Sequence, residues 1–104
     1  MIENLQTGYV RLYRSWLKSS IWTMPMAWNK LAMACLLMAN YKPGKWWDGN
    51  ETIIIPAGSF ITSERNLAKT VKITQKQIRG GLRALERDQF ISVQRAQRWT
   101  MISV

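Results

Sequence analysis

The chain has 104 residues, a length that supports a single hydrophobic core. Fifteen Lys and Arg residues against six Asp and Glu give a net charge of +9, which predicts an anionic partner, with nucleic acid first and an acidic membrane or protein second. There is no histidine and one cysteine, so the composition gives little support to an enzyme, a metal centre or a disulfide. We therefore expect no catalytic residue, no bound metal and no cofactor.

Two helices are predicted in the first half of the chain. A short amphipathic helix is indicated by apolar residues at helical spacing, namely Val10, Tyr13, Trp16 and Leu17. Residues 24–41, MPMAWNKLAMACLLMANY, predict a second helix, and its apolar residues on nearly every side indicate a central, buried position. Free cysteine is among the most buried residue types, so we expect Cys35 in the core. We expect the same of three tryptophans: Trp16, Trp22 and Trp28.

The first half contains no signal for a membrane or for secretion. Its most apolar run, LAMACLLMA, is far shorter than the ~20 residues that cross a bilayer. The N-terminal sequence MIENLQTGYV lacks a cationic region followed by a long apolar segment, so no signal peptide is evident. A soluble, cytoplasmic protein is the expectation.

The middle of the chain predicts a loop and two strands. Residues 41–51, YKPGKWWDGNE, contain Pro-Gly and Asp-Gly pairs that indicate a loop or a small hairpin, and DGNE is favoured as a turn over a metal loop. Trp46 and Trp47 point to opposite faces if extended. One of the two is then expected at the surface beside Lys42 and Lys45, and for it we slightly favour covering the core beneath the loop over stacking on a nucleobase or a protein contact. Thr52–Ile55 and Ser59–Thr62 are predicted to be extended around a Pro-Ala-Gly turn.

A pair of helices joined by a tight turn is the clearest local prediction. Thr62 or Ser63 can cap the short helix ERNLAKT. Thr74 and Gln77 match the capping-box pattern at the start of a second helix, expected over residues 74–89. One apolar stripe on this helix is formed by Ile78, Leu82 and Leu85.

Two adjacent glycines interrupt the second helix, although each costs a helix interior about 1 kcal/mol relative to alanine. A helical wheel places Gly81 beside the apolar stripe, and Gly80 toward solvent between Arg79 and Arg83. The missing Cβ of Gly81 is expected to allow close packing on the preceding helix or the wing. For Gly80 two alternatives stay open, internal packing or the approach of a phosphate or base edge to the backbone.

The C-terminal segment FISVQRAQRWTMISV predicts a β-hairpin, the wing, over residues 91–104. A loop centred on Ala96 and Gln97 gives three cross-strand pairs, Ile91 with Ile102, Val93 with Thr100 and Arg95 with Arg98. Two arginines opposite each other are destabilising unless an anion lies nearby, and a DNA phosphate or a minor groove supplies one.

The order of these elements predicts an α+β fold, mainly α, of the winged helix–turn–helix type. We expect residues 1–104 to form one domain. Residues 1–51 contribute the N-terminal helical extension and a loop, and residues 52–104 contribute the strand, the helix–turn–helix and the C-terminal β-hairpin wing.

Several segments in the same order also resemble one protein family. They are GYVRLYRSWLKSSIW, LLMANYK, WWDG, IPAGSFITSERNLAKTVKITQKQIRGGLRALERDQFI and TMISV. The chain from residue 8 to 104 resembles the N-terminal winged-helix domain of phage and prophage replication-initiation proteins, the replisome organisers associated with DnaD-like proteins. The resemblance implies origin-DNA binding in the cytoplasm or nucleoid of a bacterial host cell, and loading of replication machinery.

One departure limits what the resemblance implies. Longer relatives continue past the wing into a linker and a second domain that engages single-stranded DNA or the helicase loader. This chain ends at Val104, so we expect either a fragment or a stand-alone binder. Helicase recruitment is not carried over.

The leading hypothesis is a double-stranded DNA-binding domain of a phage-type replication initiator. The helix 74–89 is expected in the major groove, and the wing 91–104 on the backbone or in the minor groove. A homodimer or replication proteins stay open as partners, whereas no membrane and no small-molecule substrate are expected. The expected DNA contacts are Arg65, Lys69, Lys72, Thr74, Gln75, Lys76, Arg79, Gly80, Arg83, Arg95 and Arg98.

Two other functions stay open for the same fold. One is a small winged-helix transcriptional repressor, and the other is a winged helix that binds an acidic protein.

Overall fold

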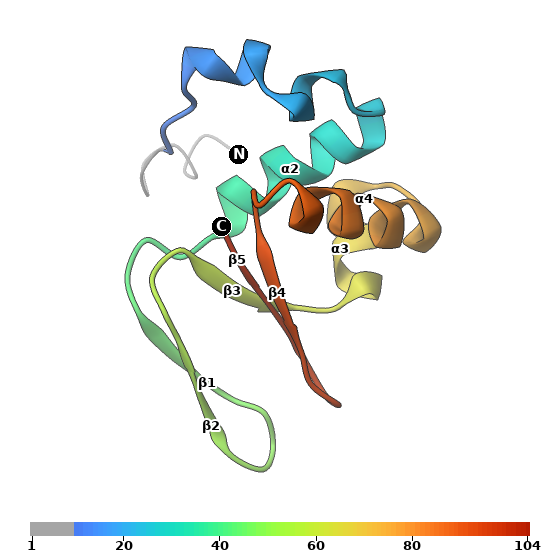
Figure 1. Cartoon of the computed structure of the whole chain (residues 1–104). Coiled ribbons are helices and arrows are strands. Elements are labelled where there is room, and N and C mark those ends of the chain that lie inside the picture. The colour runs from blue at the N-terminus through green and yellow to red at the C-terminus, as the bar shows by residue number, and fades with distance from the viewer. Residues whose placement is uncertain (1–9) are drawn as a thin grey trace.

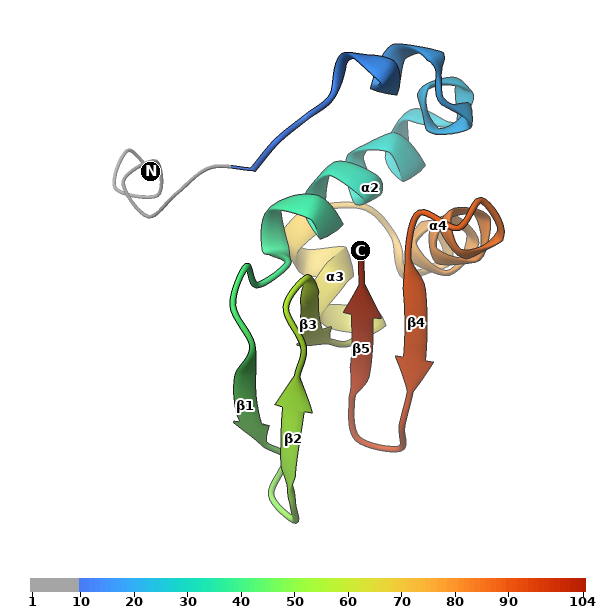
Figure 2. The same cartoon turned by 60° about the vertical axis from the view of Figure 1, so that its left-hand side comes forward.

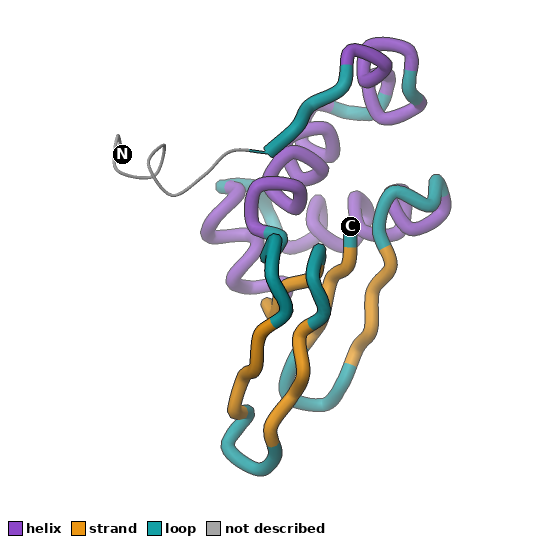
Figure 3. The backbone as a smooth tube through the Cα atoms, turned by 90° about the vertical axis from the view of Figure 1, so that its left-hand side faces the viewer, coloured by secondary structure: helices purple, strands orange, loops and turns teal. Residues whose placement is uncertain are grey.

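The structure, a computed structural model, describes residues 10–104. Three α-helices gather at one end of the molecule, and two antiparallel sheets extend from the other end (Figures 1 and 3). The α-helices are α2 (Met26–Met38), α3 (Glu64–Val71) and α4 (Gln75–Arg87). The strands are β1 (Gly44–Trp47), β2 (Thr52–Ile55), β3 (Ser59–Thr62), β4 (Ser92–Arg95) and β5 (Thr100–Ser103). The expected α+β class is confirmed.

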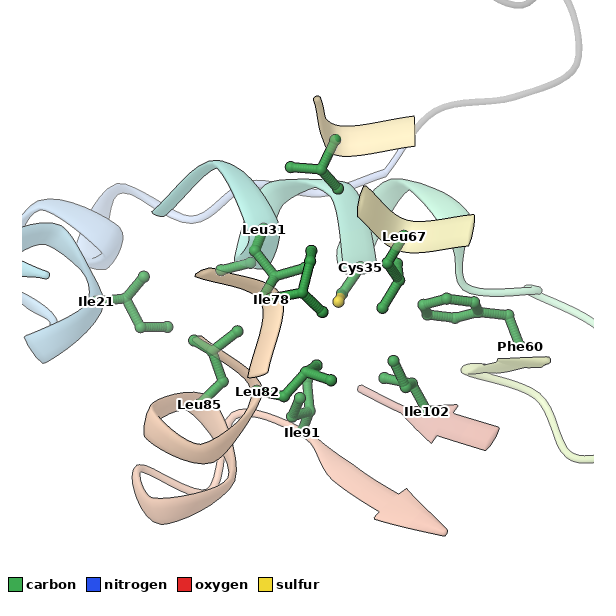
Figure 4. Close-up of a cluster of buried hydrophobic side chains, with 12 residues drawn as sticks. Ile21, Leu31, Cys35, Phe60, Leu67, Ile78, Leu82, Leu85, Ile91 and Ile102 are labelled. Atoms are coloured by element: carbon green, nitrogen blue, oxygen red, sulfur yellow. The ribbon is translucent and has the colours of Figure 1, made fainter. Parts of the chain in front are cut away.

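The core lies where α2, α3 and α4 meet the three-stranded sheet (Figure 4). The stripe predicted on α4 is buried, and Leu31 and Cys35 of α2 face it from the other side of the core (Figure 4). Burial raises the pKa of the Cys35 thiol to about 12, so this group stays protonated and unreactive at neutral pH. The predicted core position of Cys35 is confirmed.

Residues 10–23 differ most from the prediction. They form two short 3-10 helices, η1 (Arg14–Lys18) and η2 (Ser20–Thr23), in place of one amphipathic α-helix. The residue before η1 is Tyr13, whose side chain makes no capping hydrogen bond, and only Ile21 of this segment is buried. Three of the four residues of the expected stripe are exposed: Val10, Tyr13 and Leu17.

The predictions for α2 and the N-terminal tryptophans are partly wrong. Helix α2 begins directly after Pro25 and buries one side, but Met26 and Leu37 are exposed, so the helix is not buried all round. Trp22 is 51% exposed and is not a core residue. Trp16 and Trp28 are half-buried. The wide apolar surface of α2 therefore exceeds what the described residues 10–104 cover.

The β3-β5-β4 sheet contains the predicted wing, with a different register (Figure 2). Val93 pairs with Ile102 and Arg95 pairs with Thr100, two residues away from the prediction. The connecting loop is residues 96–99, closed by a 2.9 Å hydrogen bond from the Ala96 N–H to the Trp99 carbonyl. A shift of two residues keeps every side chain on its expected face of the sheet. It also removes the proposed pairing of Arg95 with Arg98.

The segment predicted as a loop or small hairpin is a hairpin, in which β1 pairs with β2. Strands β2 and β3 flank the predicted turn but belong to different sheets. The DGNE turn is confirmed, since the Asp48 carboxylate accepts hydrogen bonds of 2.7 Å from the backbone N–H groups of Asn50 and Glu51. Trp46 is half-buried, whereas Trp47 is 62% exposed, so the two side chains lie on opposite faces as expected. The exposed one, Trp47, does not cover the core.

Candidate nucleic-acid interface

Helix α4 begins and packs as its sequence predicts. The Thr74 hydroxyl accepts a hydrogen bond of 3.1 Å from the Gln77 N–H, and the Gln77 side-chain oxygen accepts one of 2.9 Å from the Thr74 N–H. This capping box satisfies two backbone donors at the helix start. Ile78, Leu82 and Leu85 are buried, which fixes the rotation of the helix about its axis. The opposite face of α4 must therefore point to solvent.

That opposite face is cationic. Lys76, Arg79 and Arg83 follow one another at intervals of three and four residues, so they lie on one side of α4, and all three are exposed. Arg87 continues the row after four more residues and is also exposed. Arg87 is not among the contacts expected from the sequence, although its four-residue spacing from Arg83 places it on the same side of the helix. Gln75, which can pair with an adenine edge, is exposed in the first turn of the helix.

Helix α3 and the turn after it add three exposed cations: Arg65, Lys69 and Lys72. Ser63 caps this helix as predicted, with its hydroxyl accepting a 3.1 Å hydrogen bond from the Asn66 N–H. Lys72 ends the helix in the left-handed conformation, with φ of 64°. A residue with a Cβ atom is unfavourable there by about 1–2 kcal/mol relative to glycine. The chain thus keeps a lysine where its backbone favours glycine.

An ion pair ties Arg79 to α3. Its Nε donates to the Glu64 carboxylate over 3.0 Å, and both side chains remain partly exposed. Within residues 10–104, the two terminal nitrogens of this guanidinium make no hydrogen bond to protein. An exposed ion pair contributes only about 0–1 kcal/mol to stability. This pair therefore orients Arg79 and leaves its two terminal nitrogens available to bind an anion.

The wing arginines lie apart from each other. Arg95 ends β4, and its terminal nitrogen donates to the Glu86 carboxylate over 3.2 Å, which joins the hairpin to α4. Arg98 lies in the loop, where its side chain approaches Gly49 of the β1–β2 turn. The Asp48 carboxyl beside it has a lowered pKa, mainly because it accepts the Glu51 N–H, with a smaller contribution from the Arg98 charge. The expected repulsion between opposed arginines is therefore wrong.

The two glycines of α4 both meet helix α2. A Cβ atom on Gly81 would lie 2.7 Å from Leu31 Cδ2 and 2.9 Å from Trp28 Cδ1, so close packing is confirmed, with α2 as the partner. A Cβ atom on Gly80 would lie 3.0 Å from Trp28 Cζ2. Gly80 therefore faces the indole ring and not open solvent, so its helical-wheel placement toward solvent is wrong. Of the two alternatives left open for Gly80, the contact with Trp28 favours internal packing.

The expected cations of α3 and α4 are thus exposed on two helices that the Arg79–Glu64 ion pair joins, and the wing cations lie at two separate positions. The missing Cβ of Gly80 faces Trp28. In residues 10–104 no cluster of three or more acidic, Cys or His side chains is arranged to hold a metal ion. None of the helices in this range combines the length and apolarity that crossing a bilayer requires.

Comparison of the chain with protein-family models, curated proteins and solved structures finds no match.

Proposed function

We propose that the chain is a winged helix–turn–helix domain that binds double-stranded DNA, with α4 in the major groove and the β4–β5 hairpin on the backbone or in the minor groove. The observation that carries this proposal is the cationic face of α4, formed by Lys76, Arg79, Arg83 and Arg87 opposite the buried stripe. A helix of this width fits the major groove, and arginine can pair with both acceptors of a guanine edge.

The charges around this face support a polyanion as the partner. The two acidic side chains on the helices, Glu64 and Glu86, are each paired with an arginine. Lys69 and Lys72 extend the positive surface beyond α4, where phosphate contacts set orientation without reading sequence. The further assignment to a phage-type replication initiator rests on the sequence resemblance alone.

Selection of bound sequences from random DNA duplexes tests the proposal most directly. Tandem direct repeats in the selected sites support an initiator, whereas palindromes with a dimeric protein support a repressor. Salt titration separates both from a protein-binding module. About five to eight phosphate contacts imply a slope of log affinity against log salt concentration of about −5 to −7. Affinity that does not change with salt would contradict DNA binding.

Two substitutions distinguish base reading from phosphate contact. Arg79→Ala is expected to cost about 1–3 kcal/mol of binding free energy and to relax the preference at one base position. Lys69→Ala is expected to weaken binding to all duplexes alike. The reverse pattern would show that α4 does not read bases.

Lys72 offers a test in which stability and binding change in opposite directions. Lys72→Gly relieves the left-handed backbone and is expected to raise the free energy of unfolding by about 0.5–1 kcal/mol. The same change removes a phosphate contact and makes the salt slope shallower by about 1. Gln89, also left-handed with φ of 62°, supplies the matched control, because Gln89→Gly relieves the backbone with no change of charge.

A further inference from the structure

The β1–β2 hairpin has two different faces. Side chains alternate along each strand, so Lys45 and Trp47 of β1 share one face with their cross-strand partners Ile54 and Thr52. All four residues are exposed, whereas Trp46 and Ile53 on the other face are half-buried. We call the exposed set, Lys45, Trp47, Thr52 and Ile54, the outer face of the hairpin.

The outer face leaves large apolar groups in water. Trp47 is 62% exposed and Ile54 is 68% exposed, although the hairpin that presents them is fully paired. Tyr41, just before the hairpin, is 80% exposed. A cluster of exposed aromatic and aliphatic groups on a rigid sheet is typical of a binding surface.

The charges on this surface are positive. Lys45 belongs to the outer face, and the ammonium group of Lys42 lies 5.6 Å from the centre of the Tyr41 ring. Residues 4–47 contain no Asp or Glu. The nearest acids are in the β1–β2 turn: Asp48, whose carboxylate accepts backbone N–H groups within that turn, and the exposed Glu51, which precedes Thr52. Neither belongs to the outer face. The surface therefore suits an anionic partner, and a second copy of the chain would oppose lysine to lysine.

We propose that the outer face of the β1–β2 hairpin binds single-stranded DNA, with an unpaired base stacked on Trp47 and the flanking phosphates on Lys45 and Lys42. An exposed indole flanked by cations is the arrangement that single-strand binders use, because every base has a stacking surface and every linkage has a charge. The bases of a duplex stack on one another, so only an unpaired base presents its face to Trp47. This surface is distinct from the cationic face of α4 and does not depend on duplex binding.

The two hairpins also lie close together at their ends. Both hairpins project in the same direction from the helices (Figures 1 and 2). The β1–β2 turn lies against the β4–β5 loop, where a Cβ atom on Gly49 would be 3.7 Å from Arg98 Nη1.

A labelled oligothymidylate of about 12 nucleotides, within the range of known site sizes, is the probe, and fluorescence anisotropy with the whole chain gives its Kd. Trp47→Ala is expected to weaken binding at least about fivefold, and Trp47→Phe less, since the smaller ring still stacks. Trp22→Ala removes another exposed tryptophan and is the matched control, expected to change Kd by less than about twofold. Circular dichroism checks that each variant is folded.

Two further probes decide what the outer face recognises. An abasic strand of equal length keeps the phosphates but has no bases to stack. Its affinity for the unmodified chain should be as low as the affinity of oligothymidylate for Trp47→Ala. Equal affinity for the abasic and thymidylate strands, or equal losses in Trp22→Ala and Trp47→Ala, would overturn the proposal. A polyglutamate peptide is the second probe. If Trp47→Ala lowers its affinity as much as it lowers the affinity for oligothymidylate, the surface recognises an acidic protein and the proposal is overturned. The affinity for a DNA duplex is measured in parallel, and Trp47→Ala should leave it unchanged. Loss of duplex binding in the unmodified chain would contradict the proposed function, whereas loss of the Trp47 effect on oligothymidylate would contradict only the single-strand site.

Discussion

Helix α4 and residues 10–23 have the same kind of apolar spacing, and their structures are opposite. Helix α4 buries its stripe completely and presents its cations to solvent. Residues 10–23 form two 3-10 helices and expose most of the stripe. The difference lies in the ends, because α4 has a capping box, whereas no side chain caps η1. A short helix without a cap or a surface to cover it is unfavourable in water. Apolar spacing alone is therefore not sufficient to predict an α-helix, and helix α2, which also lacks a side-chain cap, forms where the core covers one of its sides.

A few side chains hold residues 10–23 to the rest of the molecule. The Trp16 indole N–H donates to the Asn29 side-chain oxygen over 3.3 Å, and its ring meets Phe90 edge-on with centroids 5.7 Å apart. The Ser20 hydroxyl donates to the Asp88 carboxylate. These attachments are specific but sparse, so we expect this segment to contribute little to the cooperative core.

The largest expected contrast is between two leucines. Leu85 of α4 is fully buried, and Leu85→Ala should lower the free energy of unfolding by about 2–5 kcal/mol. Leu17 of η1 is exposed, and Leu17→Ala should change it by less than about 0.5 kcal/mol. Urea unfolding of both variants measures the difference. A loss at Leu17 as large as that at Leu85 would mean that a second chain covers residues 10–23.

The glycines of α4 give the second contrast. Gly81→Ala places a Cβ atom against Leu31 and Trp28 and should cost about 1–3 kcal/mol of overpacking, more than the ~1 kcal/mol that alanine gains in helix propensity. Gly80→Ala meets only the rim of the Trp28 ring and should be tolerated better. Melting temperatures of the two variants test the order. Gly80→Ala as the more destabilising change would place the close contact between α2 and α4 elsewhere.

The smallest contrast is between two threonines. Thr74→Ala removes the cap of α4 and should cost about 1 kcal/mol. The Thr23 hydroxyl donates to the exposed Ser20 carbonyl over 2.9 Å, and Thr23→Ala should cost less than about 0.5 kcal/mol. Chemical denaturation resolves the difference. Equal effects would show that the cap adds nothing beyond an ordinary surface hydrogen bond.

Much of the α3–α4 unit was predictable from sequence because its signals are local. Caps at Ser63 and Thr74, the short connection and the stripe on α4 all involve neighbours in the chain. The exposure of the cations on these helices could be predicted from the same pattern, because burying the apolar face of a helix leaves the opposite face in solvent. The strands of the wing were also predictable, because their β-rich composition is local.

The remaining features depend on distant residues. The wing register was wrong by two residues because the sequence does not fix a loop length between Arg95 and Thr100. Gly80 was misplaced because its neighbour, Trp28, comes from a different helix. The exposure of Trp22 was missed for the same reason, since apolar composition alone predicts burial for tryptophan wherever it occurs.

The glycine pair under Trp28 has one more consequence. The glycines on the inward side of α4 determine how closely α2 can pack against it. A methyl group added there would push the two helices apart and tilt α4, which would shift the side chains on its outward side. If the proposed duplex binding holds, Gly80 would then change the position of the outward cations without adding a side chain of its own to the interface. Graded substitutions at position 80 would test this, since every solvent-facing side chain stays the same.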